Sequence, residues 1–334
     1  MSVYIIAEAG VNHNGSLQFA KKLVDMAKQC GADAVKFQTF KAEESTGIRA
    51  DKAEYQKKNN VGKESQFDMI KKLELPFEDF IVLKQYCEEV KIDFISTPDG
   101  EQSLKCLIDL NVSKIKVGST EVTNYPFLKK IAQSKKKIIL STGMSTLGEV
   151  EKAVDILLEN GADAVELMHC TTDYPTNVED VNLKAMLTLK NAFQLQVGYS
   201  DHTLGFEAAV AAVTMGAVTI EKHITLDREM KGPDHKASMP PAEFAEYVEH
   251  IRNTEKLLGN GRKKPTAKER TIMQQVRRSI LSTRDLKTGT ILSEEDLCLK
   301  RPGTGIPPEF LPFLIGRELK RDIEKEEPIM WQDV

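Results

Sequence analysis

Residues 195–223, LQVGYSDHTLGFEAAVAAVTMGAVTIEKH, contain two short apolar runs, each of which leads into a polar cluster. The clusters are residues 199–202 (YSDH) and 221–223 (EKH), and the Ala-rich segment 206–215 between them is long enough for a helix. Short apolar runs of this kind are typical of buried parallel strands. We therefore predict a right-handed β-α-β unit in which both strands end at the same edge of a sheet.

His202 and His223 belong to these two clusters, and parallel sheets bind their ligands at the carboxyl edge. Two histidines from adjacent strand ends can form half of a divalent-metal site. Two hydrogen-bonded histidines near the surface would fit the same residues, and the sequence does not decide between these interpretations. Asp201 also has two interpretations. Either it fixes the imidazole tautomer of His202, or it is a solvated surface carboxylate.

The composition is that of an ordinary soluble globular protein. The 334 residues are 41% hydrophobic and 29% charged, and a net charge of −4 provides no basic field for nucleic acid or an anionic membrane. The cysteines are scattered without a CxxC spacing, which favours reduced thiols in the cytoplasm. The chain does not begin like a signal peptide, and no apolar run approaches the roughly 20 residues that span a bilayer. We expect a cytoplasmic protein that binds neither nucleic acid nor a membrane.

Strand-like and helix-like segments alternate about eight times along residues 1–262, which is the count and length of a TIM (β/α)8 barrel. A doubly wound open sheet is the other α/β fold with this alternation, but no GxGxxG motif follows the first expected strand, residues 3–7. We therefore predict that residues 1–262 are a TIM-barrel catalytic domain. Within them, residues 41–73 are a long polar connection, and so long a loop is expected to serve as a lid or substrate loop.

The chain changes character beyond the expected barrel. Residues 263–275 follow a turn-rich, charged stretch and are expected to form a linker. The short strand-like pieces 279–281, 290–292 and 297–299 then indicate a small β-rich domain over residues 276–334.

A barrel gathers its strand ends on one face, where barrel enzymes carry their chemistry. Five of the six histidines fall on this face or in its loops, a distribution that random surface histidines would not have. The polar residues that the topology brings there are Glu8, His13, Lys36, Gln38, Thr97, Lys116, Ser119, Glu121, Ser141, His169, Tyr174, Ser200, His202, His223 and Asp234.

Lys36 and Lys116 each end an apolar strand, with serines at neighbouring strand ends. Two ammonium groups among hydroxyls suit a phosphate or phosphate-carboxylate ligand. In one alternative, a lysine pairs with Glu8 or Glu121 as a buried ion pair; in another, a lysine forms a Schiff base, as in metal-free aldolases. The two glutamates are themselves candidates for acid–base work or for hydrogen-bonding a polyol.

The motifs at the strand ends, taken together and in order, resemble those of the sialic acid synthase family, which makes nonulosonic acids. The matching stretches are 6–15 (IAEAGVNHNG), 35–40 (VKFQTF), 96–98 (STP), 116–119 (KVGS), 141–144 (STGM), 174–176 (YPT), 200–203 (SDHT), 221–223 (EKH) and 232–235 (GPDH). Residues 300–305 (KRPGTG) are similar to the antifreeze-like (SAF, β-clip) domain that ends these enzymes.

This resemblance implies that the chain condenses phosphoenolpyruvate with an N-acylated mannosamine-type sugar, using a divalent metal, most often Mn²⁺, with Mg²⁺ or Co²⁺ as alternatives. Carried over residue by residue, it implies that the metal is held by His202 and His223, and that Glu8 assists the attacking water. The residues it assigns to phosphoenolpyruvate are Lys36, Thr97, Lys116, Ser119, Ser141 and Ser200. Those it assigns to the sugar are Gln38, Glu121, Tyr174, Asp234 and, from the partner in a domain-swapped homodimer, Arg301.

Two positions depart from the family pattern. Asp99 follows the STP motif where the family is expected to have Phe, which would make the sugar pocket more polar. Thr172 stands where some members have Asn, which leaves one phosphoenolpyruvate contact unassigned.

Residues 37–40, 52–56 and 64–66 resemble the bacterial branch that holds N-acetylneuraminate and N,N′-diacetyllegionaminate synthases, and they do not separate these two activities. Two further hypotheses of function remain. One is a Schiff-base aldolase that cleaves a sugar acid on the same barrel. The other is a non-catalytic sugar- or ice-binding protein dominated by its C-terminal domain.

Overall fold

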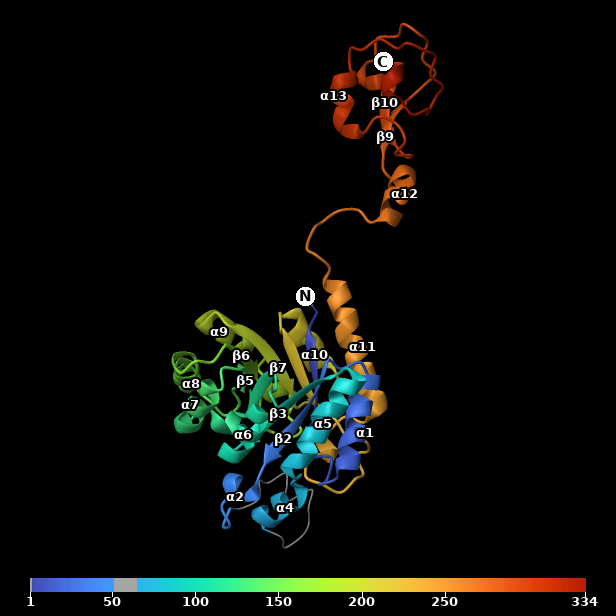
Figure 1. Cartoon of the computed structure of the whole chain (residues 1–334). Helices are drawn as coiled ribbons and strands as arrows, with labels where there is room; N and C mark the ends of the chain where they lie inside the picture. Colours follow the sequence, from blue (N-terminus) through green and yellow to red (C-terminus); the bar gives the residue numbers. More distant parts are fainter. Residues whose placement is uncertain (1, 51–64) are drawn as a thin grey trace. The chain divides into compact units, whose positions relative to one another are not determined.

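The computed structural model describes residues 2–50 and 65–334, which form two compact units that divide between Gly259 and Asn260. The first unit is a closed barrel of eight parallel strands, so the predicted TIM-barrel fold is confirmed (Figure 1). The strands are β1 (Tyr4–Gly10), β2 (Ala34–Phe40), β3 (Asp93–Asp99), β4 (Lys114–Val117), β5 (Lys137–Ser141), β6 (Ala164–His169), β7 (Gln196–Asp201) and β8 (Thr219–His223). Each strand pairs with the next, and β1 pairs with β8 to close the barrel.

Amphipathic helices surround the barrel. They are α1 (Leu17–Gln29), α5 (Phe77–Val90), α6 (Glu101–Asp109), α7 (Tyr125–Gln133), α8 (Leu147–Glu159), α9 (Lys184–Phe193), α10 (Glu207–Thr214) and α11 (Pro241–Leu258). In α1, the Ser16 side chain caps the helix by accepting a hydrogen bond from the Phe19 N–H. Leu23 and Val24 are then turned into the core, where each contributes roughly 1.5–3 kcal/mol by full burial.

The connection between β2 and α5 is more structured than expected. It contains α2 (Ala42–Ser45) and α4 (Gln66–Leu73), so the prediction of one long structureless loop is wrong for its two ends. Ser65 caps α4 by accepting from the Asp68 N–H, and Met69 and Leu73 bury the inner face of this helix. Residues 51–64, with the branch motif at 52–56, lie outside the described part of the chain.

The two polar clusters lie inside the barrel strands, except for His202, which follows β7. β7 runs to Asp201 and β8 to His223, and in their register Ser200 is opposite Glu221. Side chains alternate between the two faces of a strand, so Glu221 and His223 share one face and Lys222 takes the other. This alternation separates the groups that meet in the barrel mouth from those that face the helices.

The first unit also has three short 3-10 helices, η1 (Ser119–Glu121), η2 (Val178–Asp180) and η3 (His235–Ala237). No helix in the described residues is both long enough and apolar enough to cross a membrane.

The second unit is small and built around its own apolar core, which includes Ile280, Leu292 and Ile323. Its elements are α12 (Ala267–Val276), β9 (Ser279–Ser282), η4 (Glu294–Asp296), β10 (Leu297–Lys300), η5 (Pro308–Phe310), α13 (Leu311–Leu314) and η6 (Trp331–Asp333). β9 and β10 pair antiparallel. The expected linker 263–275 contains most of α12, and the expected strand at 290–292 is reduced to one bridge, between Ile291 and Glu318.

Candidate active site

A cavity of about 240 Å³ lies at the carboxyl ends of the barrel strands. All six residues expected to hold phosphoenolpyruvate line this inner cavity, namely Lys36, Thr97, Lys116, Ser119, Ser141 and Ser200. Glu8, Glu221 and the two predicted metal ligands, His202 and His223, line it as well. The barrel therefore collects the predicted polar groups from strands that are far apart in the sequence.

Glu221 lies between the two lysines. Its Oε2 is 3.4 Å from the Lys36 Nζ and its Oε1 is 3.2 Å from the Lys116 Nζ, while Lys36 also lies 3.2 Å from Glu8 Oε1. All four side chains are at most 5% exposed. One of the expected ion pairs, Lys36 with Glu8, is thus present, but the carboxylate that contacts both lysines is Glu221.

This charge cluster shifts the pKa values of its members in different directions. Burial favours a higher pKa for Glu221, but the nearby Lys116 and Lys36 ammonium groups outweigh it and hold the pKa well below its usual range. Burial raises the pKa of Glu8 to about 7, although Lys36 opposes the change. Burial also lowers the pKa of Lys116, against the pull of Glu221. Of the two glutamates in this cluster, Glu8 is therefore the one that can exchange a proton near neutral pH.

Hydroxyl groups complete the inner cavity. The Lys116 Nζ donates to Ser141 Oγ at 2.7 Å, and Ser200 Oγ donates to Glu221 Oε1 at 3.0 Å. Ser119 Oγ accepts from the Gly143 N–H at 2.9 Å. A Cβ on Gly143 would lie 2.3 Å from Thr172 Oγ1, so only glycine lets this loop approach. Two ammonium groups and several hydroxyls in so small a space suit a compact phosphate-carboxylate anion.

The two histidines are neutral and partly unsatisfied. His202 Nδ1 lies 2.6 Å from the Thr171 carbonyl oxygen, so Nδ1 carries the proton and Nε2, which is 3.3 Å from Ser200 Oγ, keeps a lone pair. His223 Nδ1 is buried without a hydrogen-bond partner. Burial lowers the pKa of His202 to about 4, and it also holds the pKa of His223 well below its usual value.

The ring centroids of His202 and His223 are 5.6 Å apart. Two neutral imidazoles, one fixed by a backbone carbonyl and the other with an orphaned nitrogen, fit the donor set of a divalent metal. Within residues 2–50 and 65–334, no group of three or more His, Cys, Asp or Glu side chains is arranged to hold a metal ion. The described part of the chain would therefore provide two ligands, His202 and His223.

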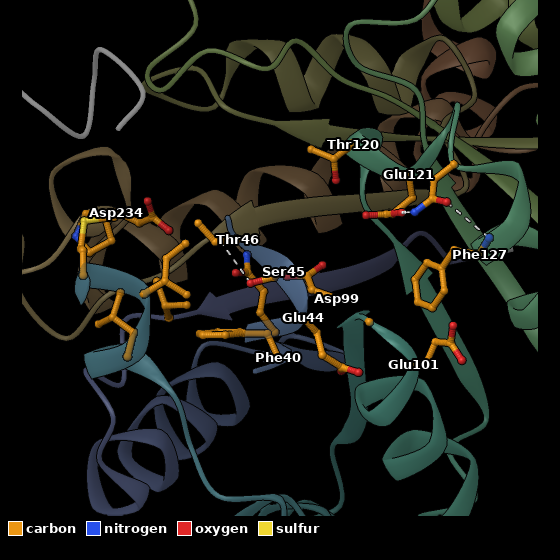
Figure 2. A pocket seen from close by; sticks show the side chains of 18 of the residues that line it. Phe40, Glu44, Ser45, Thr46, Asp99, Glu101, Thr120, Glu121, Phe127 and Asp234 are labelled. Carbon is orange, nitrogen blue, oxygen red and sulfur yellow. Dashed lines mark hydrogen bonds between the residues drawn. The ribbon is translucent and has the colours of Figure 1, made fainter. Parts of the chain in front are cut away.

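A larger outer cavity of about 720 Å³ adjoins the inner one. The two share five lining residues, Gln38, Asp99, Thr120, Tyr174 and His223. All four barrel residues expected to face the sugar line the outer cavity, namely Gln38, Glu121, Tyr174 and Asp234. In Figure 2, Asp234 and Glu121 lie at opposite ends of this cavity, with Asp99 between them. Arg301 is exposed and belongs to the second unit.

Two carboxyl groups of the outer cavity, those of Asp99 and Asp234, have no partner within residues 2–50 and 65–334. Among the described residues, none donates a hydrogen bond to or forms an ion pair with the Asp99 or Asp234 side chain. Burial raises the pKa of Asp234 to about 6. Burial, with a smaller contribution from Glu121, raises the pKa of Asp99 to about 7 although Lys36 opposes it. These groups are available to accept hydrogen bonds from a ligand.

Both interpretations of Asp201 are wrong. Its carboxylate is fully buried and lies 3.2 Å from the Lys222 Nζ, and it accepts from the Tyr247 hydroxyl at 2.9 Å and from the Thr203 N–H at 2.9 Å. It faces the helix layer and fixes the turn after His202, rather than the imidazole itself. The alternation of side chains along a strand could have predicted that Asp201 faces the helices. Asp201 and Lys222 are each next to a residue whose side chain points into the barrel mouth, so their own side chains point the other way.

His13 and His169, expected on the same face, do not line the inner cavity. His13 is buried and accepts from the Gly15 N–H at 3.1 Å, and His169 Nε2 lies 2.7 Å from the Val181 carbonyl oxygen. Glu221, by contrast, had no role assigned from sequence. The signal was available, since Glu221 and His223 are two residues apart in one strand and therefore point the same way.

A barrel whose mouth holds two buried lysines among hydroxyls, next to a wider polar cavity, defines an enzyme that joins a small anion to a polar second substrate. The chain belongs to the NeuB family, whose model matches residues 23–263, and the SAF domain model matches residues 277–334. It is therefore a phosphoenolpyruvate-condensing nonulosonic acid synthase with a C-terminal SAF domain, which confirms the family resemblance.

Individual relatives agree with this assignment. The N,N′-diacetyllegionaminic acid synthase of Legionella pneumophila is 48% identical over all of this chain and 95% of its own length. The enzyme of the same name from Campylobacter jejuni is 48% identical over 95% of this chain and 97% of its own. The structure of N-acetylneuraminic acid synthetase from Leptospira borgpetersenii has a TM-score of 0.73 and 35% identity, and the match covers 82% of this chain and 90% of that one.

Proposed function

We propose that this chain condenses phosphoenolpyruvate with 2,4-diacetamido-2,4,6-trideoxymannose to form N,N′-diacetyllegionaminate. The observation that supports this reaction best is the pair of lysines held around Glu221, beside two neutral histidines, at the junction of a small and a large cavity. Two relatives that are 48% identical carry the name of this activity. N-acetylmannosamine, which would yield N-acetylneuraminate, is the second candidate sugar.

Lys36 and Lys116 bind phosphoenolpyruvate in the inner cavity, with Thr97, Ser119, Ser141 and Ser200 providing hydroxyls. In the free protein the charge of Glu221 balances the two ammonium groups at 3.2–3.4 Å. A phosphate that enters this cavity replaces part of that contact and leaves each buried cation with an anionic partner. Pairing of this kind is what makes buried charges tolerable.

His202 and His223 hold a divalent ion, with Mn²⁺ as the preferred metal. Such an ion, when bound, polarises the aldehyde oxygen of the open-chain sugar. Tyr174 packs against both imidazoles, with ring centroids 4.1 and 5.5 Å away. It thereby helps to place C1 of the sugar next to C3 of phosphoenolpyruvate, the atoms that form the new carbon–carbon bond.

Glu8 activates the water that attacks C2. Its raised pKa, about 7, and its 3.4 Å contact with Gln38 Nε2 suit a general base whose orientation is fixed. Phosphate then leaves by cleavage of the C–O bond. The two lysine ammonium groups stabilise the charge that develops on it.

The outer cavity favours an uncharged sugar. Its acidic side chains are Glu44, Asp99, Glu101, Glu121 and Asp234, and its only basic one among the described residues, Lys130, is paired with Glu101. A phosphorylated sugar would meet like charges there, whereas hydroxyl and amide N–H groups would find acceptors.

Arg301 completes the sugar site from the partner subunit of a domain-swapped homodimer. The match of residues 277–334 to the SAF domain model supports this assignment. The reaction takes place in the cytoplasm, where phosphoenolpyruvate is made and where the five free cysteines stay reduced.

The test is phosphate release from phosphoenolpyruvate and Mn²⁺, with the two candidate sugars offered in parallel. Faster turnover of 2,4-diacetamido-2,4,6-trideoxymannose is expected, and faster turnover of N-acetylmannosamine would make the chain an N-acetylneuraminate synthase. Loss of turnover in a chelator, restored by Mn²⁺, is expected for a metal-dependent synthase. Activity that persists in chelator, together with borohydride trapping of pyruvate on Lys36 or Lys116, would instead support the Schiff-base aldolase.

A further inference from the structure

One wall of the outer cavity differs from the rest in its chemistry. It consists of Val11, Phe40, Met69, Ile70 and Leu73, three of them on α4, and we refer to it as the α4 wall. Val11, Phe40 and Leu73 form an apolar cluster of their own, with Ile70 packed against it. Apart from Ile70, these side chains are at most 8% exposed. The wall is thus a continuous apolar surface that offers no side-chain hydrogen-bonding group.

The remainder of the outer cavity is rich in acceptors. Figure 2 shows Glu101 and Glu121 toward one end, Asp234 at the other, and Phe40 of the α4 wall between them. Sugar hydroxyl and amide N–H groups can be satisfied by the carboxylates, whereas the side chains of the α4 wall offer a hydroxyl no hydrogen bond. None of the α4 wall residues lines the inner cavity. The wall therefore faces the end of the sugar farthest from the reacting aldehyde.

We propose that the α4 wall binds C6 of the sugar as a methyl group and so selects 6-deoxy sugars over those with a C6 hydroxyl. This inference rests on the proposed function and adds the residues that set its specificity. A methyl group buries apolar surface against the wall, whereas a hydroxyl would lose its hydrogen bonds to water without replacement. Discrimination by a single group in an apolar pocket is on the order of 10- to 200-fold.

The decisive comparison is N-acetylmannosamine against N-acetyl-6-deoxymannosamine, because these sugars differ by one oxygen atom. We expect kcat/KM in Mn²⁺-dependent phosphate release to be about tenfold or more higher for the 6-deoxy sugar. Equal values, or a preference for the hydroxylated sugar, would overturn this inference and leave the proposed synthase intact. Absence of turnover with these sugars and with 2,4-diacetamido-2,4,6-trideoxymannose would overturn the synthase proposal itself.

Ile70→Ser tests the wall directly, because it adds a hydroxyl at the least buried residue of the α4 wall. We expect it to lower the 6-deoxy preference several-fold while the KM for phosphoenolpyruvate stays the same. Ile81→Ser on α5 is the matched control, since Ile81 is 47% exposed and does not line the outer cavity. A preference that survives Ile70→Ser unchanged, or that falls equally in Ile81→Ser, would count against the α4 wall.

Discussion

Glu8 shows how burial prepares a single residue for its task. Its pKa of about 7 reflects desolvation opposed by the Lys36 charge, so the carboxylate form is both accessible and basic near neutral pH. Glu8→Gln keeps the size of the side chain and its contact with Gln38. We expect kcat to fall by about 100-fold or more, with the KM of each substrate changed only slightly, since general-base catalysis typically contributes 10²–10⁴-fold. If the steady-state rate of phosphate release falls by less than tenfold, this role for Glu8 is ruled out.

The buried Asp99 side chain lowers the free energy of unfolding by an amount that depends on pH. Its pKa is raised to about 7 in the folded protein, mainly by burial, so the folded protein keeps a proton that the unfolded chain releases at lower pH. Stability is therefore lost as the pH rises toward and through 7. We expect Asp99→Asn to raise Tm by about 2–4 °C at pH 8, or ~1 kcal/mol, and by less at pH 5. A thermal melt in which the gain is equal at the two pH values would contradict this account.

The sequence alone predicted most of the residues that line the inner cavity, because each ends or follows an apolar strand. Lys36, Lys116 and Ser200 needed only that pattern and the barrel topology. This pattern did not predict a role for Glu221. The pattern marks residues at the strand end, whereas the position of Glu221 follows from the alternation of side chains within the strand. Its contact with two lysines depends on side chains from three strands, which no local pattern specifies.

At the level of elements, the buried Asp201–Lys222 pair joins strands β7 and β8, and Tyr247 attaches helix α11 to this pair. Asp201 holds the Thr203 N–H at 2.9 Å, and the Lys222 Nζ donates to the Thr203 carbonyl oxygen. Tyr247 of α11 donates to Asp201 from the helix side. These contacts fix the backbone turn that begins at His202, so the pair positions this imidazole through the backbone and not by direct contact.

Asp201→Asn is therefore expected to weaken Mn²⁺ binding about tenfold, within the 10–100-fold range of groups that orient metal ligands. Calorimetric titration of the substrate-free protein with Mn²⁺ measures this without relying on turnover. Tyr86→Phe, which removes a 2.7 Å hydrogen bond to Asp25 between α5 and α1, is the control for a general loss of stability. Unchanged affinity in Asp201→Asn, with only a lower Tm, would reduce the pair to a structural role.

Element boundaries followed closely from periodicity where a helix or strand has one apolar face. The expected helix at 206–215 contains α10, and the expected strands at 279–281 and 297–299 lie within β9 and β10. The connection 41–73 was harder, because α4 is only eight residues long and its apolar face is completed by Val11 and Phe40, which are distant in sequence. Only the Ser65 cap, with Asp68 three residues later, marked its start.

For the whole molecule, the proposed domain swap predicts complementation between two defective chains. Arg301→Ala should raise the KM for the sugar with little change for phosphoenolpyruvate, and Lys116→Met should abolish turnover. In a swapped heterodimer, one site combines an intact barrel with an intact tail. Co-expression of the two variants should therefore restore a sugar KM close to that of the parent protein. If the co-expressed variants keep the high sugar KM of Arg301→Ala, the second unit of each chain serves the barrel of the same chain.

The central claim is that the barrel mouth condenses phosphoenolpyruvate with a sugar by adding water at C2 and cleaving the C–O bond. It is tested most directly by running the reaction in ¹⁸O-labelled water with Mn²⁺ and 2,4-diacetamido-2,4,6-trideoxymannose. Mass spectrometry of the first phosphate released should find no ¹⁸O, because the bridging oxygen leaves with phosphorus. One ¹⁸O atom in each phosphate would mean that water attacks phosphorus, and it would contradict the roles assigned to Glu8, Lys36 and Lys116.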